Sequence, residues 1–237
     1  MRSIPELFNY APFPIKSSSP TNWDFSRRYV FYACNTFAGG RGQTEAEEAH
    51  AAGKKWLSNI NIISEIAKLN SDSLADNIQS HPGMKDPDYD GLCVDEISFS
   101  GNPVAQYIYA QALRKIINPG NRLIYTWVIG NPFLRGVHSD FISAIMNSGE
   151  GSGKLLYEAY CHPQTTEEAA SKYIKKKLEL SVKKYKDFYP GILSGMEIIF
   201  ANFTEFSRLS LDHYPQVDFK YYLDMQMNLI ANSREFT

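Results

Sequence analysis

The sequence alternates short apolar runs with longer segments of helical periodicity, and this alternation constrains the fold more than any other feature. Five runs are rich in Tyr, Phe, Ile and Val: residues 28–37, 90–99, 122–129, 154–160 and 195–203. Most of them lack strict alternation of apolar and polar residues, which indicates strands buried on both faces of a parallel sheet. Repeated strand and helix units with right-handed crossovers build either a TIM barrel or an open doubly wound sheet.

The segments between the runs predict helices with one apolar face each. The longest helix is expected over residues 44–69, where Trp56, Ile60 and Ile63 recur at intervals of three or four residues. Thr166 is placed to cap another helix at its amino end. Further apolar stripes lie in residues 104–116, 170–185 and 219–230. Each stripe is expected to pack against the sheet.

The length of the chain decides between the two architectures. A complete TIM barrel needs about 250 residues and eight strands, whereas this chain has 237 residues and five clear strand-like runs. Its last residues follow a predicted helix, where a further strand would be expected. We therefore expect one α/β domain over residues 1–237 with a TIM-barrel-like fold that is incomplete or truncated. An open doubly wound parallel sheet is the alternative.

Charge and hydropathy exclude several classes of partner. The 24 Lys and Arg residues are balanced by 26 Asp and Glu residues, so we expect no nucleic-acid partner. The sequence has no run of the roughly 18 or more apolar residues that a membrane span needs, and its start lacks the apolar core of a secretory signal. Two interpretations of its location remain: a cytosolic protein, or a mature or truncated piece of a longer one.

The sequence carries no convincing cofactor or metal motif. Residues 148–156 resemble a phosphate-binding loop, but Ser148 stands where that loop requires Gly and Leu155 where it requires Ser or Thr. The five histidines show neither an H-E-x-x-H motif nor a metal-ligand spacing with cysteines. The three cysteines, Cys34, Cys93 and Cys161, are expected to be buried free thiols. We therefore expect no cofactor and no metal.

Polar residues at the ends of the predicted strands are the candidate site residues, because ligands bind beyond the carboxyl ends of parallel strands. Asp95 and Glu96 are adjacent acids near the end of one run, and Glu158 lies at the end of another. Carboxyl groups from separate strands can serve as the general acid and the general base in the cleavage of an acetal. The expected substrate contacts are Asn35, Trp127, Tyr160, His162 and Asn202.

Strand alternation assigns the two adjacent acids to opposite faces. Glu96 should point the same way as Val94, whereas Asp95 should point the same way as Ile97. One acid would then face the barrel axis or a cleft, and the other would face the helices or hold the following loop. A purely structural role, in which the acids only hold that loop, stays open.

Residues 90–96, D-G-L-C-V-D-E, resemble a strand of sugar-active TIM barrels in the broad glycoside hydrolase-like superfamily. In that superfamily, acids at the end of the strand serve catalysis or substrate contact. The run also matches part of the D-G-x-D-x-D-x-E signature of family 18 chitinases through Asp90, Gly91 and Asp95. Cys93 replaces the middle Asp, however, and Ile97 occupies the place of the catalytic Glu. The proton donor of a chitinase would be missing unless Glu96 supplied it.

We therefore expect a carbohydrate-active protein, most simply a glycoside hydrolase that acts on an oligosaccharide or polysaccharide. Glu96 or Asp95 would be the acid or base, and Glu158 would be the partner. The alternative is a non-catalytic carbohydrate-binding relative, in which the same acids hold a ligand or a loop. A third hypothesis, a flavodoxin-like sheet that binds a nucleotide, would need a phosphate loop that the sequence does not show.

Overall fold

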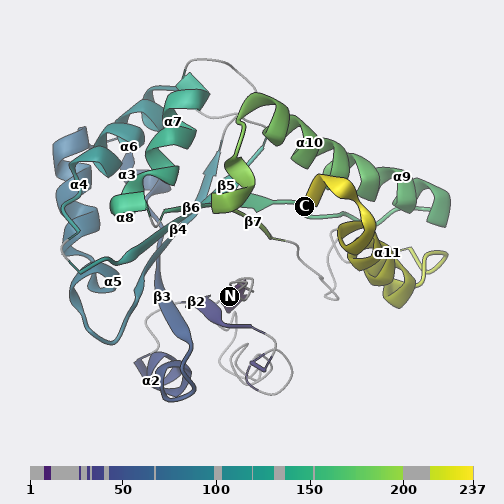
Figure 1. Ribbon diagram of the computed structural model, residues 1–237, viewed down its shortest axis with the longest axis horizontal. Coiled ribbons are helices and arrows are strands. Elements are labelled where there is room, and N and C mark those ends of the chain that lie inside the picture. Colours follow the sequence, from purple (N-terminus) through teal and green to yellow (C-terminus); the bar gives the residue numbers. More distant parts are fainter. Residues whose placement is uncertain are drawn as a thin grey trace.

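Seven parallel strands form one sheet in the computed structural model of the protein (Figure 1). The structure describes residues 8–11, 27, 31–32, 34–39, 43–66, 68–98, 103–118, 120–130, 137–151, 153–199 and 214–236. The strands are β1 (Phe8–Ala11), β2 (Thr36–Gly39), β3 (Lys55–Ile60), β4 (Gly91–Ser98), β5 (Leu123–Ile129), β6 (Lys154–Glu158) and β7 (Met196–Ile199). The predicted α/β class is confirmed.

The strand order is that of the sequence, from β1 to β7, and every neighbouring pair is parallel. A doubly wound sheet requires a point at which the strand order reverses, and the described strands contain no such reversal. The sheet curls into a half-barrel with helices on its convex side (Figure 1). Among the described strands β1 and β7 do not pair, so the sheet is a half-barrel without observed closure.

Helices connect most of the strands and cover one face of the sheet. They are α2 (Gln43–Ala51), α3 (Ile63–Ile66), α4 (Ser71–Ser80), α5 (Pro82–Lys85), α6 (Pro103–Lys115), α7 (Val137–Met146), α8 (Ser148–Gly151), α9 (Glu167–Lys177), α10 (Glu179–Phe188) and α11 (Phe219–Asn232), with short 3₁₀ turns η2 (Ile192–Gly195) and η3 (Arg234–Phe236). The predicted cap is confirmed, because the Thr166 hydroxyl accepts a hydrogen bond from the Ala169 amide. None of the helices in the described ranges is long and apolar enough to cross a bilayer.

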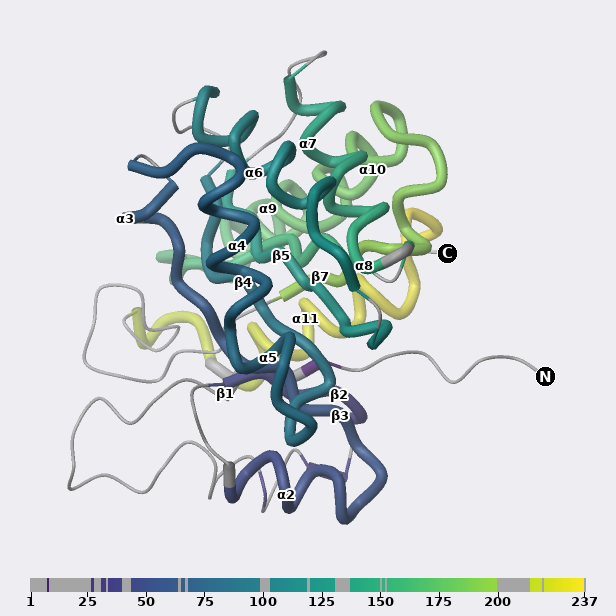
Figure 2. The backbone as a smooth tube through the Cα atoms, turned by 90° about the vertical axis from the view of Figure 1, so that its left-hand side faces the viewer, coloured from purple at the N-terminus to yellow at the C-terminus, as the bar shows by residue number. Residues whose placement is uncertain are grey.

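The expected single helix over residues 44–69 is wrong. Helix α2 ends before Gly53, whose φ of 69° lies in the left-handed region that ends helices, and the Lys54 amide donates to the Ala49 carbonyl at 2.9 Å. The chain then enters β3, where Trp56 and Ile60 share a face because both are even-numbered strand positions. A separation of four residues fits a helix and a strand equally well, so spacing alone does not distinguish them. Figure 2 shows α2 close to β2 and β3 and away from the other helices.

The two faces of the sheet carry two different cores. The convex face packs against the helices through strand residues that include Leu92, Val94, Ile124, Val128, Leu155 and Tyr157. The concave face carries a smaller cluster of Ala38, Leu57, Cys93, Tyr125, Trp127 and Leu156. Since strand side chains alternate between faces, these clusters show which way each strand residue points. All three cysteines are buried and free, as predicted.

Asp90 fastens the amino-terminal edge of the sheet. Its carboxylate accepts a hydrogen bond from the Trp56 amide at 2.7 Å and lies 2.8 Å from the Nε2 atom of His50. Its backbone amide and carbonyl bond to Trp56 and Leu123, one strand on each side. Asp90 therefore links β3, β4 and β5 at the edge opposite to the candidate site.

Candidate functional site

A β-bulge interrupts β4 at the two adjacent acids. Val94 pairs with Thr126 and Ile97 pairs with Val128, so Asp95 and Glu96 together stand opposite one residue of β5, Trp127. Two residues opposite one define a bulge, and bulges re-aim side chains next to functional sites. Glu96 has a φ of 45°, a left-handed conformation that costs about 1–3 kcal/mol for a residue other than glycine.

The bulge changes the direction of the side chains beyond it. Val94 and Ile97 are three residues apart, yet both pack in the convex core beneath the helices, which strict alternation would not allow. Asp95 and Glu96 lie between them and are not part of that core. The regular alternation on which the opposite-face assignment of the two acids depends is therefore interrupted at the bulge, because the extra residue restores Ile97 to the convex side.

Glu158 joins the two acids from the end of β6. Burial is the main cause that raises its pKa, and the negative charges of Glu96 and Asp95 raise it further, while a hydrogen bond from Trp127 and the charge of Lys177 lower it. Both adjacent acids are thus close enough for their charges to act on Glu158. We name Asp95, Glu96 and Glu158 the carboxyl cluster.

The pKa values of the other two cluster members are raised as well. Burial is the larger cause for both. The charge of Asp95 adds to the effect on Glu96, whereas a hydrogen bond from the Asn59 side chain opposes the effect on Asp95. Grouped carboxyl groups with raised pKa values are a feature of sites that hold a catalytic acid.

Two nitrogen-bearing side chains act on two of the three acids. The indole Nε1 of Trp127 lies 3.1 Å from the Oε2 atom of Glu158, and the Asn59 side chain opposes the rise in the pKa of Asp95. Within the described ranges we find no side-chain hydrogen bond to Glu96. The cluster is therefore asymmetric: two acids have a fixed neighbour, and the third is exposed.

The aromatic residues predicted as sugar contacts differ in their surroundings. Trp127 is 3% exposed, and its ring meets the edge of the Tyr160 ring with the centroids 6.2 Å apart and the planes at 84°. Tyr160 is half-buried and packs against the concave cluster. Tyr160 therefore has surface available for a ligand, whereas Trp127 supports the cluster from within.

Two other predicted contacts, Asn35 and His162, have their described partners outside the cluster. Asn35 lies just before β2, at the amino-terminal edge of the sheet, where its carbonyl accepts from the Lys55 amide; the expectation that it ends a strand is wrong, because the paired strand is Thr36–Gly39. The carbonyl of His162 accepts from the Tyr222 hydroxyl at 2.7 Å, and its ring faces Tyr173 of α9. Asn202 lies outside the described residues.

Asn59 is the neighbour of the candidate site that sequence reasoning misses. It lies in β3, within the segment expected to be helical, so its position near the carboxyl end of a strand is not recognisable from that pattern. A glycine at position 53 followed by the short run K-W-L-S-N-I is a signal that could have revealed a helix end and a strand.

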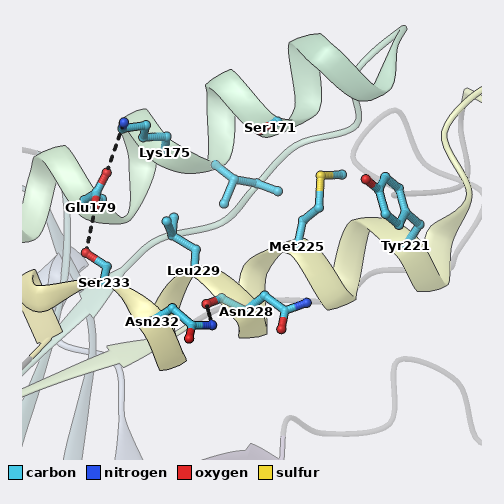
Figure 3. A pocket seen from close by; sticks show the side chains of 10 residues that line it. Ser171, Lys175, Glu179, Tyr221, Met225, Asn228, Leu229, Asn232 and Ser233 are labelled. Carbon is cyan, nitrogen blue, oxygen red and sulfur yellow. Dashed lines mark hydrogen bonds and ion pairs between the residues drawn. The ribbon is translucent and has the colours of Figure 1, made fainter.

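A separate groove of about 450 Å³ lies between α9 and α11 (Figure 3). Its polar wall includes Glu179, which accepts a hydrogen bond from Ser233 at 2.7 Å and pairs with Lys175 at 3.6 Å. Its other wall includes Met225 and Leu229 of α11. None of the predicted site residues lines this groove, so it is independent of the carboxyl cluster.

Neither the protein-family models nor the curated proteins give a match to this chain. In the part of the chain that the structure describes, no three His, Cys, Asp or Glu side chains are grouped in a way that could hold a metal ion. The chemistry of the site is therefore argued from the carboxyl cluster itself.

Neutralising Glu96 is expected to stabilise the fold at neutral pH. Burial and the charge of Asp95 raise its pKa, and a carboxyl group whose pKa is higher in the folded state loses stability as the pH rises from the unfolded to the folded pKa. With allowance for the solvent screening of an exposed side chain, Glu96→Gln should raise the melting temperature at pH 7 by about 1–3 °C. At pH 3, where both states are protonated, the difference should vanish.

Thermal denaturation at the two pH values, followed by circular dichroism, checks this expectation. Glu47→Gln, on the exposed side of α2, is a matched control that removes one carboxylate outside the cluster. A lower melting temperature of Glu96→Gln at pH 7 would contradict the electrostatic description of the cluster.

Proposed function

We propose that this protein is carbohydrate-active, most simply a glycoside hydrolase, and that its half-barrel sheet is related to the TIM barrel. The single observation that carries the proposal is the bulge in β4, at which Asp95 and Glu96 together stand opposite Trp127 and from which both charges act on Glu158. The three acids come from the carboxyl-terminal halves of parallel strands, which is the end where TIM-barrel enzymes bind their substrates.

The chemistry of glycosidic bonds needs two carboxyl groups in different protonation states. One must donate a proton to the leaving oxygen as the bond to the anomeric carbon breaks. The other must be ionised, either to take a proton from the attacking water or to attack the anomeric carbon itself. The carboxyl cluster supports both roles, because burial raises the pKa values of its members, which favours a proton donor, while the hydrogen bond from Trp127 acts in the opposite direction on Glu158.

The bulge also bears on the departure from the chitinase signature. Ile97 occupies the position of the chitinase acid, and here it packs beneath the helices. Glu96, one residue earlier, lies in the bulge, and its charge acts on Glu158. A proton donor at position 96 is therefore consistent with the geometry, although it comes from a different position of the strand.

Backbone strain gives independent support. The left-handed conformation of Glu96 would be adopted at less cost by glycine, so a glutamate at this position stabilises the fold less than the best alternative would. Strain of this kind is concentrated at functional sites. Tyr160 adds a half-buried aromatic ring beside the cluster, and aromatic rings offer flat apolar surfaces to sugars.

The proposal is tested by incubating the purified protein with a panel of fluorogenic aryl glycosides and of natural oligosaccharides and polysaccharides. Release of the fluorophore or of shorter sugars from at least one substrate is expected. Binding measured by calorimetry without any turnover would favour the non-catalytic carbohydrate-binding relative. The absence of both turnover and binding across the whole panel would overturn the proposal.

A further inference from the structure

We propose that the groove between α9 and α11 binds a neutral oligosaccharide chain, at a second site apart from the carboxyl cluster. Its volume of about 450 Å³ falls within the range of about 300–1,000 Å³ that small-ligand sites occupy. The carbohydrate class of the ligand rests on the proposed function, whereas the shape and the chemistry of the groove do not. The two can therefore fail separately.

The groove is elongated, and its two walls are fastened to each other. Tyr221 lies at one end and Ser233 at the other, with Met225 and Leu229 between them (Figure 3). At a rise of about 1.5 Å per helical residue, the lining side of α11 from Tyr221 to Asn232 is about 16 Å long. The Ser233 hydroxyl donates to Glu179, the first residue of α10, which ties the end of α11 to the α9–α10 unit. The groove can therefore accept a short chain of sugar rings between walls that are already in place.

The apolar part of the groove offers surfaces for the C–H faces of sugar rings. Ile174 is buried, and Met225 and Leu229 pack against the convex core. Tyr221 is 47% exposed, and the described residues give its hydroxyl no hydrogen bond. Aromatic rings are flat apolar surfaces with a polar edge, so Tyr221 can stack on a sugar ring at the end of the groove.

Uncharged polar side chains line the rest of the groove. Within the described ranges, neither the Ser171 hydroxyl nor the Asn228 side-chain amide has a hydrogen-bond partner. The Asn232 amide nitrogen donates to the Asn228 carbonyl at 2.8 Å, which leaves its Oδ1 atom to accept. Hydroxyl and amide groups both donate and accept, as sugar hydroxyls do. An apolar helix of a partner protein would bury these groups without partners, which is unfavourable.

The charge of the groove favours a ligand without net charge. Lys175 and Glu179 form a loose ion pair at 3.6 Å, and their side chains are 64% and 22% exposed. An anionic ligand would meet the Glu179 carboxylate, and a cationic ligand would meet the Lys175 ammonium group. A sugar hydroxyl can donate to the carboxylate and accept from the ammonium group, so a neutral chain of hydroxyl-bearing rings suits both.

The site is tested by ¹H–¹⁵N NMR of the full chain, with cellopentaose, chitopentaose, xylopentaose and mannopentaose as probes. The side-chain amide signal of Asn228, identified by its loss in Asn228→Ala, should shift and saturate with at least one probe. The amide of Asn77 in α4, which already donates to Glu65, is the internal control and should not shift. An Asn228 signal that none of the four probes moves would overturn the inference.

Tyr221→Ala should weaken binding of the responding probe by about 3- to 10-fold, because the stacking surface at the end of the groove is lost. Isothermal titration calorimetry measures the affinity. Tyr107→Ala is the matched control, since it removes an exposed tyrosine (57%) from α6, which does not line the groove. Equal affinities of Tyr221→Ala and the unaltered protein would contradict the placement of the sugar.

The outcomes distinguish the groove from the proposed function. Turnover of a glycoside with an unmoved Asn228 signal would remove the groove site and leave the hydrolase. A shifted Asn228 signal without any turnover would support the groove site and count against hydrolysis. A groove that responds to an amphipathic model helix of Leu and Lys, and to none of the sugars, would be a protein-docking surface, and the inference would be wrong.

Discussion

Glu96→Gln and Glu158→Gln should each lower the rate of glycoside hydrolysis by about 10²–10⁴-fold, the contribution that a positioned acid or base makes to catalysis. Glutamine keeps the size of the side chain and its capacity to accept a hydrogen bond, but it can neither donate the carboxyl proton nor act as a base. Initial rates on the best substrate of the panel, at several pH values, measure the loss. Melting temperatures near that of the unaltered protein would show that the fold is retained.

Glu197→Gln is the matched control for this pair of substitutions. Glu197 lies in β7, beside β6, and its carboxylate forms an ion pair with Lys154 at 2.5 Å. It is therefore an acid of a neighbouring strand that already has a structural partner. Its substitution should leave the rate within a few-fold of the original. Unchanged turnover in both Glu96→Gln and Glu158→Gln would remove the catalytic role of the cluster.

The spacing of apolar residues explains why the sequence predicts some strands and not others. The sequence locates β4, β5 and β6 to within about two residues because these runs are apolar on both faces and bounded by loop residues. Strand β3 is not predicted because its apolar residues, Trp56 and Ile60, are four residues apart, a spacing that fits both a helix and a strand. The strand predicted over residues 28–37 overlaps β2 only at its end, because the aromatic residues at 29, 31 and 32 extend the apolar pattern toward the amino terminus.

The composition of the site is predictable from the sequence, but its geometry is not. The positions of Asp95, Glu96 and Glu158 at strand ends identify them as candidates, and the charges of Asp95 and Glu96 act on Glu158. Alternation cannot supply the bulge, since a bulge is a change of register between two strands and not a property of either strand alone. One signal is present in the sequence: Val94 and Ile97 enclose two acids, and two apolar residues three apart cannot share a face of a regular strand.

Gly91→Ala should destabilise the fold by about 3–5 kcal/mol, the range of the severe packing substitutions. A Cβ atom at this position would collide with the backbone of Leu123 in β5, first of all with its carbonyl oxygen. Leu123 is the residue that pairs with Gly91, so the collision cannot be relieved by a side-chain rotation. The first residue of β4 is thus restricted to glycine by the close approach of the next strand.

The same position explains why part of the chitinase-like signature is present without the whole of it. Asp90 fastens three strands at the amino-terminal edge, and Gly91 admits the neighbouring backbone. The sheet requires both of these residues, whether or not the protein is catalytic. Asp90 and Gly91 are therefore explained by the architecture alone, while the proposed chemistry depends on the two acids of the bulge.

Urea denaturation of Gly91→Ala, followed by far-ultraviolet circular dichroism, measures the loss of stability. Gly53→Ala is the matched control: its φ of 69° is unfavourable for alanine, but a Cβ atom there would meet nothing within 4 Å. That control should cost only about 1 kcal/mol. Equal costs at the two positions would mean that the backbone of Leu123 does not approach position 91 as closely as described, and the register of β4 against β5 on which the bulge depends would then be in error.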